Sequence, residues 1–172
     1  MQAGLGRACT SVVTEYRNRK QEHTAKYTVE VDCMTEEEID EQLRELLWSY
    51  RQFYLYDLDD KGVSADEQKH LQEQSKLAWD TLHAAFSSKG ILTEEYLQDP
   101  SDGAEEKIKV QLKTWTKELQ WPVEIEKGGW LGTADSAEDC NIQTQRFLSG
   151  NLWPFVKVIR YIVSSPSRVS SD

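Results

Sequence analysis

Polar and apolar side chains alternate in two short segments near the amino terminus. The first segment, SVVTEYRN, occupies residues 11–18, and the second, KYTVEVD, occupies residues 26–32. Alternation at every second residue has the period of a β-strand that is buried on one face. The polar residues RNRKQEHT between the segments are typical of a connection between paired strands. We therefore predict an N-terminal β-hairpin.

The hydrophobic pattern changes to a helical period at Thr35. In the sequence TEEE, Thr35 and Glu38 have the spacing of a capping box, in which each side chain bonds the backbone amide of the other residue. Apolar residues then recur at intervals of three and four, which predicts an amphipathic helix over 35–56. The apolar positions are Ile39, Leu43, Leu46, Tyr50 and Phe53.

Two further long helices are predicted after the first. Ser64 and Glu67 form a second capping box at the start of residues 64–87, and Gly90 follows that segment as a typical helix terminator. A third apolar stripe predicts a helix over residues 103–120.

The last third of the chain is less regular. Residues 123–135, VEIEKGGWLGTAD, are rich in glycine and are expected to form a loop. Ser136 is expected to cap a shorter helix over 136–148. The final apolar run, residues 154–163, is long enough for a helix, but its β-branched residues favour a buried strand. Both structures stay open for this run.

Together these elements predict an α+β fold that is mostly helical. It has an N-terminal hairpin, three to four amphipathic helices and one C-terminal strand. We expect a loop and hairpin over residues 1–32, a helical insertion over 33–150, an apolar strand over 151–163 and a disordered polar tail over 164–172.

Charge and cysteine content narrow the classes of function. The 172 residues carry 20 Lys and Arg against 30 Asp and Glu, a formal net charge of −10, so we expect no nucleic-acid partner. Cys9, Cys33 and Cys140 form no C-x-x-C pair, which argues against a disulfide framework or a zinc site. No apolar run is long enough to span a bilayer, and no signal peptide is visible. We therefore expect an intracellular protein, cytoplasmic or nuclear, without a membrane segment.

The segment YLYDLDDKGVSADEQ, residues 54–68, has some features of a calcium-binding loop. Asp57 and Asp59 occupy ligand positions, but Lys61 occupies the fifth position, and Gln68 stands where a bidentate glutamate is needed. A lysine ammonium repels the ion. We interpret the segment as an acidic turn between two helices.

The sequence GLGRACTSVVTEY, followed by a strand, TEEE and LRELLWSYRQF, resembles the dynamin-like large GTPases, with the fungal relatives of the nuclear GTPase SLIP-GC as the closest likeness. In that family a glycine-rich switch I loop containing ACT precedes a strand, and a long helical insertion follows. A segment similar to LWPFVKVIR then leads into the strand that carries the D-L-P-G switch II motif. The resemblance covers about Ala3 to Arg160.

The resemblance implies a site for GTP and Mg²⁺. By position, Thr10 would be the switch I threonine that contacts Mg²⁺, and Gly6 and Arg7 would lie at the nucleotide on the same loop. The P-loop, expected before Ala3, and the D-L-P-G motif, expected after Val163, do not occur in the chain. The chain would then be an excerpt of a P-loop GTPase α/β domain. It would not be catalytic alone, and its partner would be the rest of that domain.

Alternatives stay open on the same residues. Thr10 can simply begin a strand. The chain can also be an independent acidic helical module that binds a partner protein and has no enzymatic activity, because its three long helices are amphipathic. If the chain is an excerpt, its strands lack their usual neighbours, and exposed edges predict marginal stability or self-association.

Overall fold

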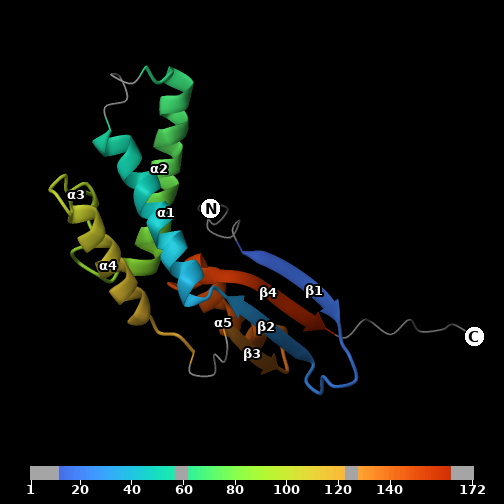
Figure 1. Cartoon of the computed structure of the whole chain (residues 1–172). Coiled ribbons are helices and arrows are strands. Elements are labelled where there is room, and N and C mark those ends of the chain that lie inside the picture. The colour runs from blue at the N-terminus through green and yellow to red at the C-terminus, as the bar shows by residue number, and fades with distance from the viewer. Residues whose placement is uncertain (1–11, 57–61, 123–127, 164–172) are drawn as a thin grey trace, which may run out of the picture. The chain divides into compact units, whose positions relative to one another are not determined.

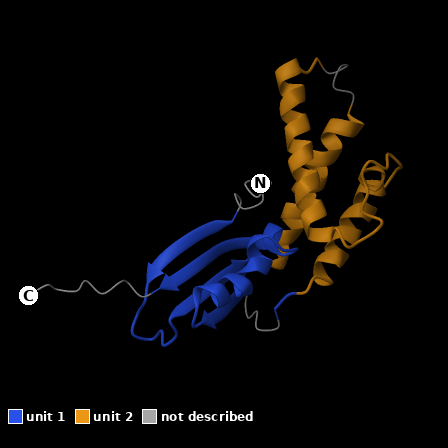
Figure 2. Cartoon of the chain, turned by 180° about the vertical axis from the view of Figure 1, so that it is seen from behind, with its two compact units in different colours: residues 1–34, 121–172 blue, residues 35–120 orange. Residues whose placement is uncertain are grey.

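The chain folds into two compact units, which Figure 2 shows in different colours. The first, here called the sheet unit, comprises residues 1–34 and 121–172, and the second, the helical unit, comprises residues 35–120. The structure is a computed structural model, and it describes residues 12–56, 62–122 and 128–163.

A four-stranded mixed sheet forms the centre of the sheet unit (Figure 1). Its strands are β1 (Val13–Asn18), β2 (Tyr27–Cys33), β3 (Gly129–Ala134) and β4 (Val156–Val163). They lie side by side in the order β1-β4-β2-β3. Strand β4 runs parallel to β1 and antiparallel to β2, and β2 runs antiparallel to β3.

The strand order confirms the α+β fold class and corrects the predicted hairpin. Both N-terminal strands exist, but they do not pair with each other, because β4 lies between them and pairs with both. Burial explains this order, since Val156, Ile159 and Ile162 of β4 are buried. An apolar strand gains most from a central position, whereas the polar β1 lies at the edge. For residues 154–163 the sequence left helix and strand open, and the structure shows a strand from Val156 to Val163.

Strand β3 corrects the loop that the glycine content predicts for residues 123–135. Residues 129–134 form a strand that pairs with β2 along its length, and residues 123–127 lie outside the described part of the chain. A Cβ at Gly132 would collide with the indole ring of Trp130. The glycine therefore makes room for a buried tryptophan within the strand, rather than marking a loop.

Helix α5 (Ala137–Leu148) packs against one face of the sheet, over β2 and β3. The predicted cap is confirmed, because the Ser136 hydroxyl accepts a hydrogen bond from the Asp139 amide at 3.1 Å. Phe147 is buried, and its ring centroid lies 5.1 Å from that of Trp130. A short 3-10 helix, Trp153–Phe155, leads from α5 towards β4.

The helical unit contains α1 (Glu36–Leu55), α2 (Ala65–Phe86), α3 (Glu94–Leu97) and α4 (Ala104–Lys117). The three long helices were all predicted from the sequence and are confirmed. Both capping boxes are also confirmed: the Thr35 hydroxyl accepts from the Glu38 amide at 3.2 Å, and the Glu38 carboxylate accepts from the Thr35 amide at 2.8 Å. Ser64 and Glu67 repeat the arrangement at the start of α2.

The core of the helical unit follows most of the predicted stripe. Ile39, Leu43 and Tyr50 of α1 are buried, and Leu47 is buried in place of the neighbouring Leu46. The unit ends at residue 120, so it is shorter than the insertion expected over 33–150, and β3 and α5 belong to the sheet unit. None of the helices in the described part of the chain combines the length and apolar character that a bilayer crossing requires.

Candidate functional site

The residues that the resemblance places at the nucleotide, Gly6, Arg7 and Thr10, lie outside the described residues. The acidic turn from Asp57 to Lys61 does so as well. Strand β1, which follows Thr10 closely, begins at Val13. The described residues contain two other clusters of charged side chains, one in each unit.

Arg160 of β4 lies at the centre of the charged cluster in the sheet unit. The strand register places Glu15 of β1 and Glu30 of β2 beside Arg160, with Asp32 two residues further along β2. The guanidinium Nε is 3.2 Å from Glu15, Nη1 is 3.9 Å from Glu30 and Nη2 is 2.5 Å from Asp32. Three carboxylates thus surround one guanidinium, and the contacts join β1, β4 and β2 through their side chains.

Electrostatics hold the Arg160 guanidinium in its charged form. The hydrogen bond to Asp32 raises the pKa of Arg160, and the negative charges of Asp32 and Glu15 add to this effect against the opposing cost of partial burial. An arginine that stays charged orients its carboxylate neighbours and does not transfer protons. The Arg160 cluster is therefore suited to fixing three strands in register rather than to acid–base catalysis.

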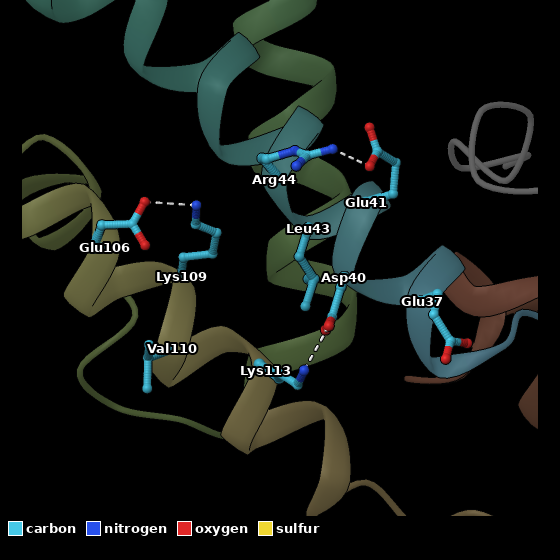
Figure 3. A pocket seen from close by; sticks show the side chains of 9 residues that line it. All are labelled: Glu37, Asp40, Glu41, Leu43, Arg44, Glu106, Lys109, Val110 and Lys113. Carbon is cyan, nitrogen blue, oxygen red and sulfur yellow. Dashed lines mark hydrogen bonds and ion pairs between the residues drawn. The ribbon is translucent and has the colours of Figure 1, made fainter.

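A groove of about 340 Å³ lies between α1 and α4 of the helical unit (Figure 3). Lys113 Nζ of α4 is 2.5 Å from Asp40 Oδ2 of α1, and this hydrogen bond raises the pKa of Lys113. Arg44 and Lys109 pair with acidic residues of their own helices. Val110, which also lines the groove, is 64% exposed. The groove thus combines paired charges with an exposed apolar side chain.

A second groove, of about 260 Å³, follows the same side of α1. It is lined by Trp48, Leu55, Tyr56 and Pro100, among others, and Trp48 is half exposed. Arg44 of the first groove and Trp48 of the second are four residues apart, so one stripe of α1 contributes to both. Exposed aromatic side chains are enriched in protein–protein interfaces, so this stripe is a candidate surface for a protein partner.

Burial keeps two titratable side chains of the described residues, Cys33 and Tyr50, in their protonated forms. Burial raises the pKa of the Cys33 thiol to about 11, helped by the charge of Asp32, and burial raises the pKa of Tyr50 to about 12. Both side chains are therefore protonated at neutral pH, and Cys33 is a poor nucleophile. In residues 12–56, 62–122 and 128–163, no group of three or more His, Cys, Asp or Glu side chains is arranged to hold a metal ion.

The raised pKa of Cys33 predicts slow reaction with thiol reagents. At pH 8 the thiolate fraction falls about a hundredfold when the pKa rises from 9.0 to about 11. In a Cys9→Ser/Cys140→Ser variant, a disulfide reagent should therefore label native Cys33 at least about a hundredfold more slowly than the urea-unfolded chain. The labelling rate of the folded protein should rise with pH up to about 11. A plateau below pH 9 would contradict the buried, protonated thiol.

No family model, no curated protein and no solved structure matches the chain. Sequence reasoning missed the Arg160 cluster and the α1–α4 groove. One signal for the cluster was present, because Arg160 is a charged residue inside the apolar run VKVIRYIV.

Proposed function

We propose that the chain is part of the GTPase domain of a dynamin-like large GTPase and contributes the switch I side of a GTP and Mg²⁺ site. The observation that carries the proposal is the order of the units along the chain. The helical unit, residues 35–120, is inserted between β2 and β3 of a single sheet. The resemblance implies this order, with a helical insertion between the switch I strand and the segment LWPFVKVIR, which here leads into and forms much of β4.

In this proposal Thr10 supplies a hydroxyl ligand to Mg²⁺, and β1 holds the end of the switch I loop in the sheet. Gly6 and Arg7 lie on the same loop, next to the nucleotide. Residues of the P-loop type, whose backbone amides cradle the α- and β-phosphates, come from the rest of the domain. The chain alone is therefore inactive, its partner is the remainder of that domain, and its compartment is the cytoplasm or the nucleus.

Three experiments test this function. Calorimetry of the 172-residue chain with GTP and Mg²⁺ should detect no binding. Sequencing of the surrounding transcript should find a P-loop upstream and D-L-P-G downstream. In the longer protein, Thr10→Ala should lower Mg²⁺-dependent GTP hydrolysis on the order of a hundredfold. The matched control, Thr14→Ala on the exposed strand β1, should leave hydrolysis unchanged. A transcript without a P-loop would exclude the proposal.

The α1–α4 groove favours a second candidate function, an acidic helical module that binds a protein partner. Its support is two exposed apolar side chains, Val110 in this groove and the half-exposed Trp48 in the second groove along α1. A transcript with neither GTPase motif would favour this function. Crosslinks to a partner should then concentrate on Lys109 and Lys113, which line the groove.

A further inference from the structure

Strand β1 presents one side to no other strand among the described residues. Its only described neighbour in the sheet is β4, so β1 forms one edge of the order β1-β4-β2-β3. The side chains of Val13 and Tyr16 are 54% and 76% exposed. The strand also lacks proline and the bulges that commonly protect edge strands from pairing.

The backbone of β1 shows which of its groups point to the edge. The Arg19 amide donates a hydrogen bond to the Val163 carbonyl of β4 at 3.0 Å. The amide and carbonyl of successive residues in a strand point alternately to its two sides. Odd-numbered residues of β1 therefore face β4. Thr14 and Tyr16 direct their backbone amides and carbonyls away from β4, towards the edge, where a second strand can pair with them.

The charges of β1 select one register for pairing with a second copy. An antiparallel pair centred on Tyr16 places Glu15 opposite Arg17 of the second copy, and this contact occurs twice because of the two-fold symmetry. Moving the centre by one residue places the two Glu15 side chains, or the two Arg17 side chains, opposite each other. Arg17 is available for the contact, because its pair with Glu15 in the same chain is exposed and contributes little in water.

The antiparallel pairing centred on Tyr16 also extends the aromatic contact between Tyr16 and Tyr161. The ring of Tyr16 stacks on that of Tyr161 in β4, with centroids 5.5 Å apart and planes inclined by 21°. When Tyr16 is the central residue, the two copies of Tyr16 lie opposite each other on the same face, and the ring contacts continue from one Tyr161 to the other. Backbone direction, charge and aromatic contacts thus agree on one register.

We propose that β1 pairs antiparallel with β1 of a second copy of this chain, centred on Tyr16, and joins the two sheets into one continuous sheet. The interface is symmetric, with two Glu15–Arg17 contacts around the central tyrosines. The inference goes beyond the proposed GTPase function and does not rest on it. It uses only the described residues of the sheet unit.

Sedimentation velocity over a wide range of concentration tests the pairing. The wild-type chain should show a monomer–dimer equilibrium. Tyr16→Pro should abolish the dimer, because it removes an amide that points away from β4 and so leaves the β1–β4 hydrogen bonds in place. Arg17→Glu should raise the dissociation constant roughly tenfold or more, since like charges then face each other. The control Lys20→Glu, which makes the same charge change just beyond β1, should dimerise like the wild type.

Disulfide crosslinking in a Cys9→Ser background tests the register. Opposite residues in a hydrogen-bonded antiparallel pair have Cα atoms about 5.5 Å apart, within reach of a disulfide, so Tyr16→Cys should give a covalent dimer. The two Thr14 residues would be about 14 Å apart, so Thr14→Cys should not crosslink. A chain that stays monomeric at all concentrations overturns the proposal. A dimer that Arg17→Glu leaves intact, or that crosslinks at Thr14 and not at Tyr16, overturns it as well.

Discussion

Replacing Phe147 with alanine should lower the free energy of unfolding of the sheet unit by about 3–5 kcal/mol. Phe147 of α5 is buried, and its ring packs 5.1 Å from the ring of Trp130 in β3. The Arg146 guanidinium lies 5.0 Å from the centroid of the Phe147 ring. Alanine removes the ring and leaves a cavity between the helix and the sheet. Urea denaturation, followed region by region through amide hydrogen exchange, measures the loss, which should be greatest in β2, β3 and α5.

Two control variants separate this packing from the helix itself. Ile142→Ala removes an apolar side chain from α5 at a position that is 63% exposed, so it should change stability by no more than about 0.5 kcal/mol. Phe147→Leu keeps much of the buried volume and should cost about 1 kcal/mol. If Phe147→Ala costs no more than Ile142→Ala, α5 does not belong to the core of the sheet unit.

Local signals in the sequence predicted the helix starts well. Thr35, Ser64 and Ser136 each cap a helix through contacts that span three residues, so the amino-acid pattern contains the whole interaction. The apolar stripes of the long helices are equally local, because their period follows from helix geometry. These local patterns were therefore enough to locate the three long helices of the helical unit.

Strand pairing depended on distant residues and was predicted less well. Consecutive strands often pair, which favoured the hairpin, but β4 arrives from the end of the chain and takes the position between β1 and β2. In β3, Gly132 interrupts the strand pattern for a reason visible only in the structure, the space needed by the Trp130 ring. Such contacts depend on the sheet register, which local periodicity does not contain.

The candidate sites show the same difference between local sequence signals and contacts of distant residues. Sequence motifs suggested the switch I residues, and these lie outside the described residues. The Arg160 cluster requires the register of three strands, since Glu15 and Arg160 are far apart in the sequence and adjacent in the sheet. The α1–α4 groove requires two helices to pack side by side. Neither arrangement has a short sequence signature.

Replacing Arg51 with methionine should lower the free energy of unfolding of the helical unit by about 3–5 kcal/mol. Arg51 is a buried charged residue on α1, only 9% exposed. Its Nη1 donates to the carbonyl oxygens of Leu97 at 2.8 Å and Asp99 at 3.0 Å, at the C-terminal end of α3. Methionine keeps the apolar stem but removes both charge-assisted hydrogen bonds, so the buried Leu97 carbonyl and the partly buried Asp99 carbonyl lose their donor.

The matched control is Arg44→Met on the same helix. The Arg44 side chain is about half exposed and pairs with the equally exposed Glu41, so its loss should cost no more than about 0.5 kcal/mol. Arg51→Lys, which keeps the charge but loses the planar fork, should recover part of the stability. Amide exchange should accelerate first at Gln98, whose amide nitrogen bonds the Glu94 carbonyl in the last turn of α3. Equal costs for Arg51→Met and Arg44→Met would mean that the two carbonyls find other donors, and that Arg51 does not anchor this end of α3 to α1.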